Sequence, residues 1–121
     1  MTGTSDPPER EHDALLERVL DDPDLIEPGF RPLSTERSTP AGAVDLYGKD
    51  VEGRSVAVEF KTERAGPDAV SQLRRYVDAL ARDLHAKAEV RGVLVAPSVT
   101  DRARRMLEER GLTFVPLWPP R

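Results

Sequence analysis

Apolar residues recur at helical spacing in three segments of the chain. Residues 10–20 carry the first set, and Asp22-Pro23 ends it, because a residue that precedes proline avoids the helical conformation. A second helix is predicted after Pro67, which suits a first helical turn. A third is predicted from about Thr100 to Arg110, where Gly111 is a natural C-terminal stop. The stripe that the second helix should bury consists of Val70, Leu73, Val77, Leu80 and Leu84.

Shorter apolar runs and period-two alternation predict five strands. Residues 30–36 form the first, which Pro32 makes an edge strand or an irregular one. Residues 44–49 and 54–61 form the next two, joined by a hairpin in which Gly53 suits a positive φ. The apolar run 90–96 predicts a strand in the interior of the sheet, and residues 113–117 predict the last strand.

This order of elements predicts the fold class. The strand–helix–strand unit from Val56 to Ala96 should be a right-handed crossover between parallel strands, whereas the preceding strands pair through a hairpin. We therefore predict an α/β sandwich with a central mixed sheet flanked by helices. Residues 1–9 are predicted to be a disordered lead-in, and residues 10–121 a single domain.

Composition restricts the class of protein. The 121 residues include no run of about 18 apolar positions and no secretion signal, so we expect a cytoplasmic protein without a membrane partner. The absence of cysteine excludes thiolate metal sites, and two histidines are too few for a histidine-built one, so any metal should be bound by oxygen. The net charge of −4 does not by itself indicate nucleic-acid binding, although clustered basic residues can override net charge.

Charged side chains at the end of an apolar strand are the main candidates for chemistry. Glu59 and Lys61 should project to one side of the strand and Phe60 to the other. Charges in such a place are costly unless something pairs them. A divalent ion held by Asp45 and Glu59, with Lys61 beside it, would supply that pairing.

Asp45 followed fourteen residues later by Glu59-x-Lys61 is the pattern of PD-(D/E)xK nucleases. Phosphodiester hydrolysis uses a hard cation, and Mg²⁺ binds carboxylate oxygens while keeping several waters. The ion lowers the pKa of a bound water, and Lys61 can orient or deprotonate that water or stabilise the phosphate. The alternative is a solvated strand end with a surface ion pair worth about 1 kcal/mol or less. The triplet alone does not decide between the two.

The segments around the triplet resemble one family, the NucS/EndoMS endonucleases of archaea and actinobacteria. The resemblance runs from about Asp13 to Pro120 and lies in five segments in the same order: 25–30, 39–46, 56–61, 69–77 and 91–98. It implies a restriction-endonuclease-like PD-(D/E)xK domain that cuts DNA with Mg²⁺ or Mn²⁺ and serves DNA repair.

The resemblance also implies roles for individual residues. Asp45, Glu59 and Lys61 fall on the family's catalytic triplet, and Gln72 falls on the glutamine of its Gln-Leu-x-Arg-Tyr motif, close to the metal site. Gln72 is otherwise a helix-surface amide. The first helix of the family opens with a glutamate near the active site, and the matching position here is Glu11, His12 or Glu17. Candidate DNA contacts, each with a surface or packing role as its alternative, are Arg37, Arg64, Arg74, Arg75 and Tyr76.

The family's proteins also carry an N-terminal domain that dimerises and takes up mismatched bases, for which we expect no room in this chain. The expected partner is DNA in single-stranded, branched or mismatched form. Two alternatives stay open: a DNA-binding module without catalysis, and a catalytic subunit that needs a recognition subunit supplied in trans. The presence of Asp45, Glu59, Lys61 and Gln72 argues against the first.

Overall fold

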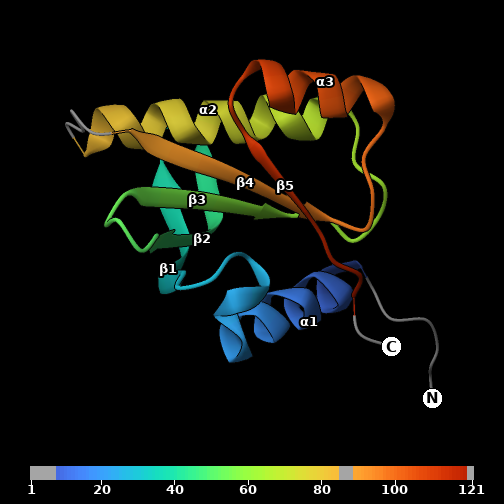
Figure 1. Ribbon diagram of the computed structural model, residues 1–121, viewed down its shortest axis with the longest axis horizontal. Helices are drawn as coiled ribbons and strands as arrows, with labels where there is room; N and C mark the ends of the chain where they lie inside the picture. Colours follow the sequence, from blue (N-terminus) through green and yellow to red (C-terminus); the bar gives the residue numbers. More distant parts are fainter. Residues whose placement is uncertain (1–7, 85–88, 120–121) are drawn as a thin grey trace.

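A five-stranded sheet with helices on both faces forms the framework of the molecule (Figure 1). The structure is a computed structural model that describes residues 8–84 and 89–119. The elements in chain order are α1 (Pro8–Asp21), a 3₁₀ turn η1 (Pro23–Leu25), β1 (Arg31–Thr39), β2 (Gly42–Lys49), β3 (Ser55–Phe60), α2 (Pro67–Asp83), β4 (Val90–Ala96), α3 (Asp101–Glu109) and β5 (Thr113–Pro116).

The sheet is mixed, as the order of elements predicted. Its strands lie in sequence order, β1-β2-β3-β4-β5. The first two pairings are antiparallel and the last two are parallel. Because α2 connects β3 to the parallel β4, the carboxyl ends of β3 and β4 meet at one edge of the sheet.

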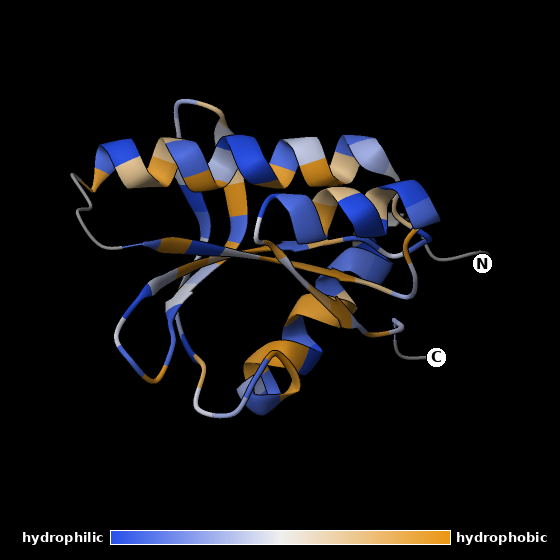
Figure 2. Ribbon diagram, turned by 45° about the horizontal axis from the view of Figure 1, so that its top comes forward, coloured by the Kyte–Doolittle hydropathy of each residue, from blue (hydrophilic) through white to orange (hydrophobic). Residues whose placement is uncertain are grey.

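The helices divide the hydrophobic core into two layers. The cores lie on opposite faces of the sheet because successive strand residues alternate: Ala57 joins α2 and α3, whereas Val58 and Phe60 join α1. Figure 2 shows the apolar side of α2 turned toward the sheet. The predicted stripe of α2 is confirmed, with Val70, Leu73 and Leu80 fully buried. No helix within the described ranges is both long and apolar enough to cross a membrane.

Strand β1 lies at the edge of the sheet, where Pro32 was expected to place it. Its register with β2 shifts between Pro32 and Ser34, which is the irregularity expected of a proline in a strand. The strand continues to Thr39, three residues beyond the predicted end. Thr39 Oγ1 donates to Gly42 O at 2.7 Å and accepts from Ala41 N at 3.0 Å. These bonds stabilise a tight turn between β1 and β2, so the two strands pair as far as Thr39 and Gly42.

Helix α1 begins at Pro8, two residues earlier than predicted. Pro8 and Glu9 therefore belong to the helix and not to the predicted lead-in, whose residues 1–7 lie outside the described part of the chain. Leu15 and Val19 are fully buried on the sheet. Docking of α1 on this face places its first turns beside the carboxyl end of β3 (Figure 1).

Candidate active site

Asp45 is fixed between β2 and β3 by two hydrogen bonds to one oxygen. Its Oδ2 accepts from the backbone N of Phe60 at 2.9 Å and lies 3.1 Å from His12 Nε2. The side chain is 18% exposed. The carboxylate is therefore aimed across the strand ends and is attached to both β3 and α1.

Glu59 projects to the side of β3 opposite Phe60, as the alternation predicted. Its carboxyl group is 9% exposed and lies beside that of Asp45. Within the described residues, Oε1 is buried and has no hydrogen-bond partner. Burial raises the pKa of Glu59 to about 8, and the negative charge of Asp45 adds to the rise while Lys61 opposes it. A buried carboxyl with an unpaired oxygen requires a proton or a cation.

Lys61 follows β3 directly and turns its amine toward the same side. Its backbone N donates to Val95 O at 2.8 Å, which continues the β3–β4 pairing by one residue. Its Nζ lies 3.8 Å from Glu59 Oε2, and its side chain is 43% exposed. The structure therefore brings two carboxyls and one amine together on adjoining strands.

An open cleft of about 530 Å³ lies over Glu59 and Lys61, whereas Asp45 is not among its lining residues. Strand β3 and the loop after it form its floor, α1 forms one wall, and Glu36 of β1 lies at its rim. Glu36 has a positive φ of 51°, an uncommon backbone conformation for a residue other than glycine. The residues that line the cleft are His12, Asp13, Glu36, Glu59, Phe60, Lys61 and Thr62.

Helix α1 contributes His12 to this cleft. Of the three positions considered from the sequence, His12 contacts Asp45, whereas Glu17 is exposed and Glu11 is not among the lining residues. Residues 12 and 45 come together only through the docking of α1 on the sheet. Local periodicity carries no signal for that contact.

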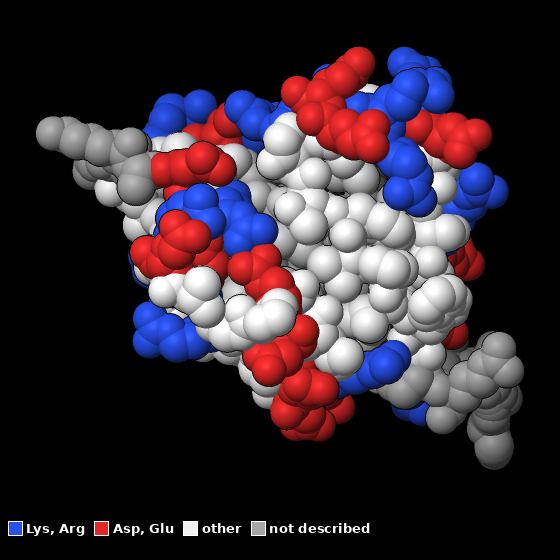
Figure 3. Space-filling view, viewed as in Figure 1, with Lys and Arg blue, Asp and Glu red and all other residues white. Residues whose placement is uncertain are grey.

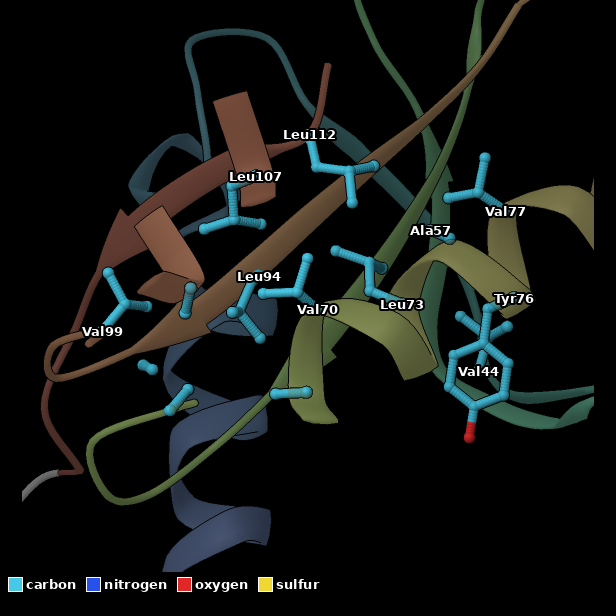
Figure 4. Close-up of a cluster of buried hydrophobic side chains, with 14 of the residues drawn as sticks. Val44, Ala57, Val70, Leu73, Tyr76, Val77, Leu94, Val99, Leu107 and Leu112 are labelled. Atoms are coloured by element: carbon cyan, nitrogen blue, oxygen red, sulfur yellow. The ribbon is translucent and has the colours of Figure 1, made fainter. Parts of the chain in front are cut away.

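Gln72 and Tyr76 lie on α2, and Tyr76 is close enough to the acidic pair to be affected by its charge. Gln72 Oε1 accepts a hydrogen bond from Arg75, and Gln72 also bonds to the Tyr76 hydroxyl. Tyr76 is 8% exposed and packs in the core near Val44 (Figure 4). Burial raises the pKa of Tyr76; the bond from Gln72 opposes this rise, and the charges of Glu59 and Asp45 increase it. Neither Gln72 nor Tyr76 lines the cleft.

The four candidate arginines differ in their contacts. The Arg37 guanidinium lies 4.7 Å from the Tyr47 ring centroid and 3.6 Å from Asp83. Arg74 pairs with Asp78 at 3.2 Å. Arg64 is exposed, close to Lys61 in the chain, and forms no ion pair with another described residue. The face in Figure 3 shows basic and acidic side chains interspersed around a broad uncharged area.

The donor set fits a hard divalent cation. Asp45 and Glu59 offer oxygen ligands, which Mg²⁺ and Mn²⁺ prefer, and the unpaired Oε1 of Glu59 has the character of a vacant ligand position. No group of three or more acidic, histidine or cysteine side chains suited to a metal occurs in residues 8–84 and 89–119. An ion held here would therefore keep several waters, as Mg²⁺ usually does.

Comparison with protein families connects this geometry to known proteins. The model of the endonuclease NucS C-terminal domain matches residues 11–121, nearly the whole chain. The chain belongs to the NucS C-terminal domain family. The resemblance noted from the five sequence segments is thereby confirmed.

Relatives named as NucS endonucleases come from several archaea. Endonuclease NucS 1 of Halobacterium salinarum is 64% identical over 107 residues, which cover 88% of this chain and 45% of the relative. Endonuclease NucS of Methanopyrus kandleri is 53% identical over 105 residues, which cover 86% of this chain and 40% of the relative. The chain thus spans less than half the length of these NucS relatives.

Solved NucS and EndoMS structures share the fold. A structure described as an EndoMS–dsDNA2 complex superposes with a TM-score of 0.87 at 40% identity, covering 100% of this chain and 48% of the other. A repair endonuclease from Pyrococcus abyssi superposes with a TM-score of 0.85 at 39% identity, and the match covers 98% of this chain and 50% of the other. The predicted restriction-endonuclease-like α/β sandwich is therefore confirmed.

Proposed function

We propose that this NucS-family chain hydrolyses phosphodiester bonds in DNA with Mg²⁺ or Mn²⁺ held by Asp45 and Glu59. The observation that supports this most strongly is the carboxyl pair formed by Asp45 of β2 and Glu59 near the end of β3. Glu59 is buried beside Asp45 and has one oxygen without a partner among the described residues. Such a pair costs stability when both groups are ionised, and a cation that joins the two groups removes this cost.

The surrounding side chains suit the steps of hydrolysis. A divalent ion at this site would lower the pKa of a bound water and stabilise charge on the phosphate. Lys61, with its amine near Glu59 and open to the cleft, contacts a phosphate oxygen or takes the proton of the attacking water. Gln72 of α2 contacts the water or the phosphate once Arg75 releases its amide oxygen.

DNA is the proposed substrate and partner. The names of similar proteins include an endonuclease, a repair endonuclease and a complex with dsDNA. We propose cleavage of branched, mismatched or single-stranded sites in DNA, a role in DNA repair, and action in the cytoplasm. Arg64 is the strongest candidate for a phosphate contact beside the cleft. Tyr76 and the remaining candidate arginines, Arg37, Arg74 and Arg75, are proposed as further DNA contacts.

Cleavage assays with matched variants test this function. Mismatched, branched and single-stranded DNA would be incubated with the protein and Mg²⁺, Mn²⁺ or a chelator. Asp45→Asn and Glu59→Gln should each lower the cleavage rate at least about 100-fold, because the ion and its water are lost. Glu108→Gln, an exposed change on α3, is the control and should cleave at the wild-type rate. Equal cleavage by wild type and Asp45→Asn would exclude this mechanism.

A second candidate is a catalytic subunit that depends on a partner for substrate choice. The observation that favours it is that the chain spans only 45% of the length of its Halobacterium relative. Adding the remaining part of such a relative as a separate protein should then raise the cleavage rate at mismatches at least about tenfold. An unchanged rate would count against the partner and leave the metal-dependent cleavage intact.

A further inference from the structure

The contact between His12 and Asp45 joins residues that are 33 positions apart in the chain. Nε2 of His12 lies 3.1 Å from Oδ2 of Asp45. An ionised carboxylate can only accept, so the proton of this hydrogen bond is on Nε2. The other ring nitrogen lies 3.9 Å from Asp13, which is too long for a hydrogen bond. Among residues 8–84 and 89–119, the imidazole therefore has one specific polar contact, and that contact is with the candidate metal ligand.

The orientation of this imidazole is fixed by the residue that also holds Asp45. The ring packs edge-on against Phe60, with centroids 6.1 Å apart and planes at 80°. The backbone N of Phe60 donates to the same Oδ2 that receives His12. Phe60 thus donates one hydrogen bond to Asp45 from its backbone, and its ring packs against His12, which donates the second.

We propose that His12 is a positioning residue that holds the Asp45 carboxylate ready for a cation. With His12 and Phe60 both donating to Oδ2, this oxygen is used within the protein, and Oδ1 is left for the ion. The inference rests on the proposed function, because it concerns the ligand that the ion would use.

A second donor matters because Asp45 lies beside another carboxyl. Whenever Glu59 loses its proton and no ion is bound, its negative charge repels the Asp45 carboxylate and favours rotation of that carboxylate away from the pair. One backbone bond to Phe60 leaves such rotation open, whereas a second donor from another element opposes it. Groups that orient metal ligands in this way typically change metal affinity 10- to 100-fold when removed.

Two substitutions separate this role from simple packing. His12→Phe keeps an aromatic ring against Phe60 and removes the donor. His12→Gln gives up the ring and keeps an N–H donor on a side chain of similar reach. Glu17→Gln, on the exposed face of the same helix, is the control. Mn²⁺ affinity would be measured by electron paramagnetic resonance titration of the full chain at constant pH, together with the melting temperature and the cleavage rate.

We expect Mn²⁺ affinity to depend on whether the side chain at position 12 has a hydrogen-bond donor, and not on whether it has an aromatic ring. His12→Phe should bind Mn²⁺ about 10- to 100-fold more weakly than wild type while melting at a similar temperature. His12→Gln should recover much of the affinity, and Glu17→Gln should match wild type. The inference would be overturned if His12→Phe bound Mn²⁺ as tightly as wild type. It would also be overturned if His12→Phe and His12→Gln bound Mn²⁺ equally weakly.

Asp45→Asn distinguishes failure of this inference from failure of the proposed function. If wild type binds Mn²⁺ and Asp45→Asn does not, the function stands, and the His12 variants decide the positioning role. If wild type fails to bind Mn²⁺ or Asp45→Asn binds it equally well, the proposed function falls and the role of His12 falls with it.

Discussion

The carboxyl group of Glu59 makes the metal-free protein less stable as pH rises. Its pKa is about 4.5 in the unfolded chain and about 8 in the folded one. Between these values the unfolded chain is ionised while the folded protein retains the proton, so unfolding becomes more favourable up to about pH 8. Removing the ionisable group removes this penalty.

Glu59→Gln should therefore raise the melting temperature in the presence of a chelator. We expect a gain of several degrees at pH 8 and almost none near pH 4.5, because both states are protonated below the unfolded pKa. Thermal unfolding followed by circular dichroism at a series of pH values would measure it. A gain that does not vary with pH would show that Glu59 is ionised in the folded protein.

The carboxyl group of Asp50, just before β3, makes the protein more stable as pH rises, which is the opposite of the effect of Glu59. Burial by itself raises the pKa of Asp50, but four hydrogen bonds, two from Arg54 and one each from Arg91 and Glu52, outweigh burial and lower it to about 2. Its ionised form therefore stabilises the fold above the unfolded value of 3.8, and this contribution is lost as pH falls through about 2.

Asp50→Asn should destabilise the protein by about 2 kcal/mol at pH 7, since each pKa unit corresponds to about 1.4 kcal/mol. The difference from wild type should shrink as pH falls from about 4 toward 2. Urea unfolding at several pH values would test this, with the exposed Glu63→Gln as control. If Asp50→Asn lowers the free energy of unfolding equally at pH 7 and pH 2, the cause is altered packing and not the loss of the ionised carboxyl group.

At the scale of elements, close contact between α2 and β4 depends on Gly92. A Cβ at this position would lie 2.7 Å from Val77 Cγ2 and 2.8 Å from Leu112 Cδ2. Gly92→Ala should therefore cost about 1–3 kcal/mol in the free energy of unfolding, because the core around it must expand. Gly66→Ala is the matched control. No heavy atom lies within 4 Å of a Cβ at Gly66, so urea unfolding should show a cost below about 1 kcal/mol.

Most elements could be predicted from the sequence because their signals are local. The alternation of Val58, Glu59 and Phe60 gave the faces of β3, and the apolar stripe of α2 gave its buried side. Lys61 faces Glu59 for the same reason. His12 could not be assigned, because its contact with Asp45 depends on how α1 docks on the sheet. Arg37 gave no sequence signal of its packing on Tyr47, which arises from pairing between β1 and β2.

At the scale of the whole molecule, the proposed function requires an acidic protein to bind an anionic substrate. The net charge is −4, and Arg37 and Arg74 already pair with acidic side chains. We expect few cations to meet DNA phosphates, so the salt dependence of binding should be shallow. Arg64 is exposed in the loop that follows Lys61.

Arg64→Ala should weaken DNA binding similarly for all sequences. It should also reduce the slope of log affinity against log salt concentration by about 1, the value for one lost phosphate contact. Fluorescence anisotropy in the Asp45→Asn background, which prevents cleavage, would measure both. Arg102→Ala on α3 is the control and should leave the slope unchanged. If the slope of Arg64→Ala is also unchanged, Arg64 makes no phosphate contact.

The first helix and the last strand meet on one face of the sheet. Leu117 is buried in the same core as Leu15 and Val19, and Arg18 donates to the carbonyl of Trp118 at 3.0 Å. During synthesis on the ribosome, α1 emerges before the strands that supply its packing surface, and Leu117 is the last buried residue of that surface to emerge. A nascent chain therefore carries Asp45 and Glu59 before the last part of the surface that holds α1 beside them has been synthesised.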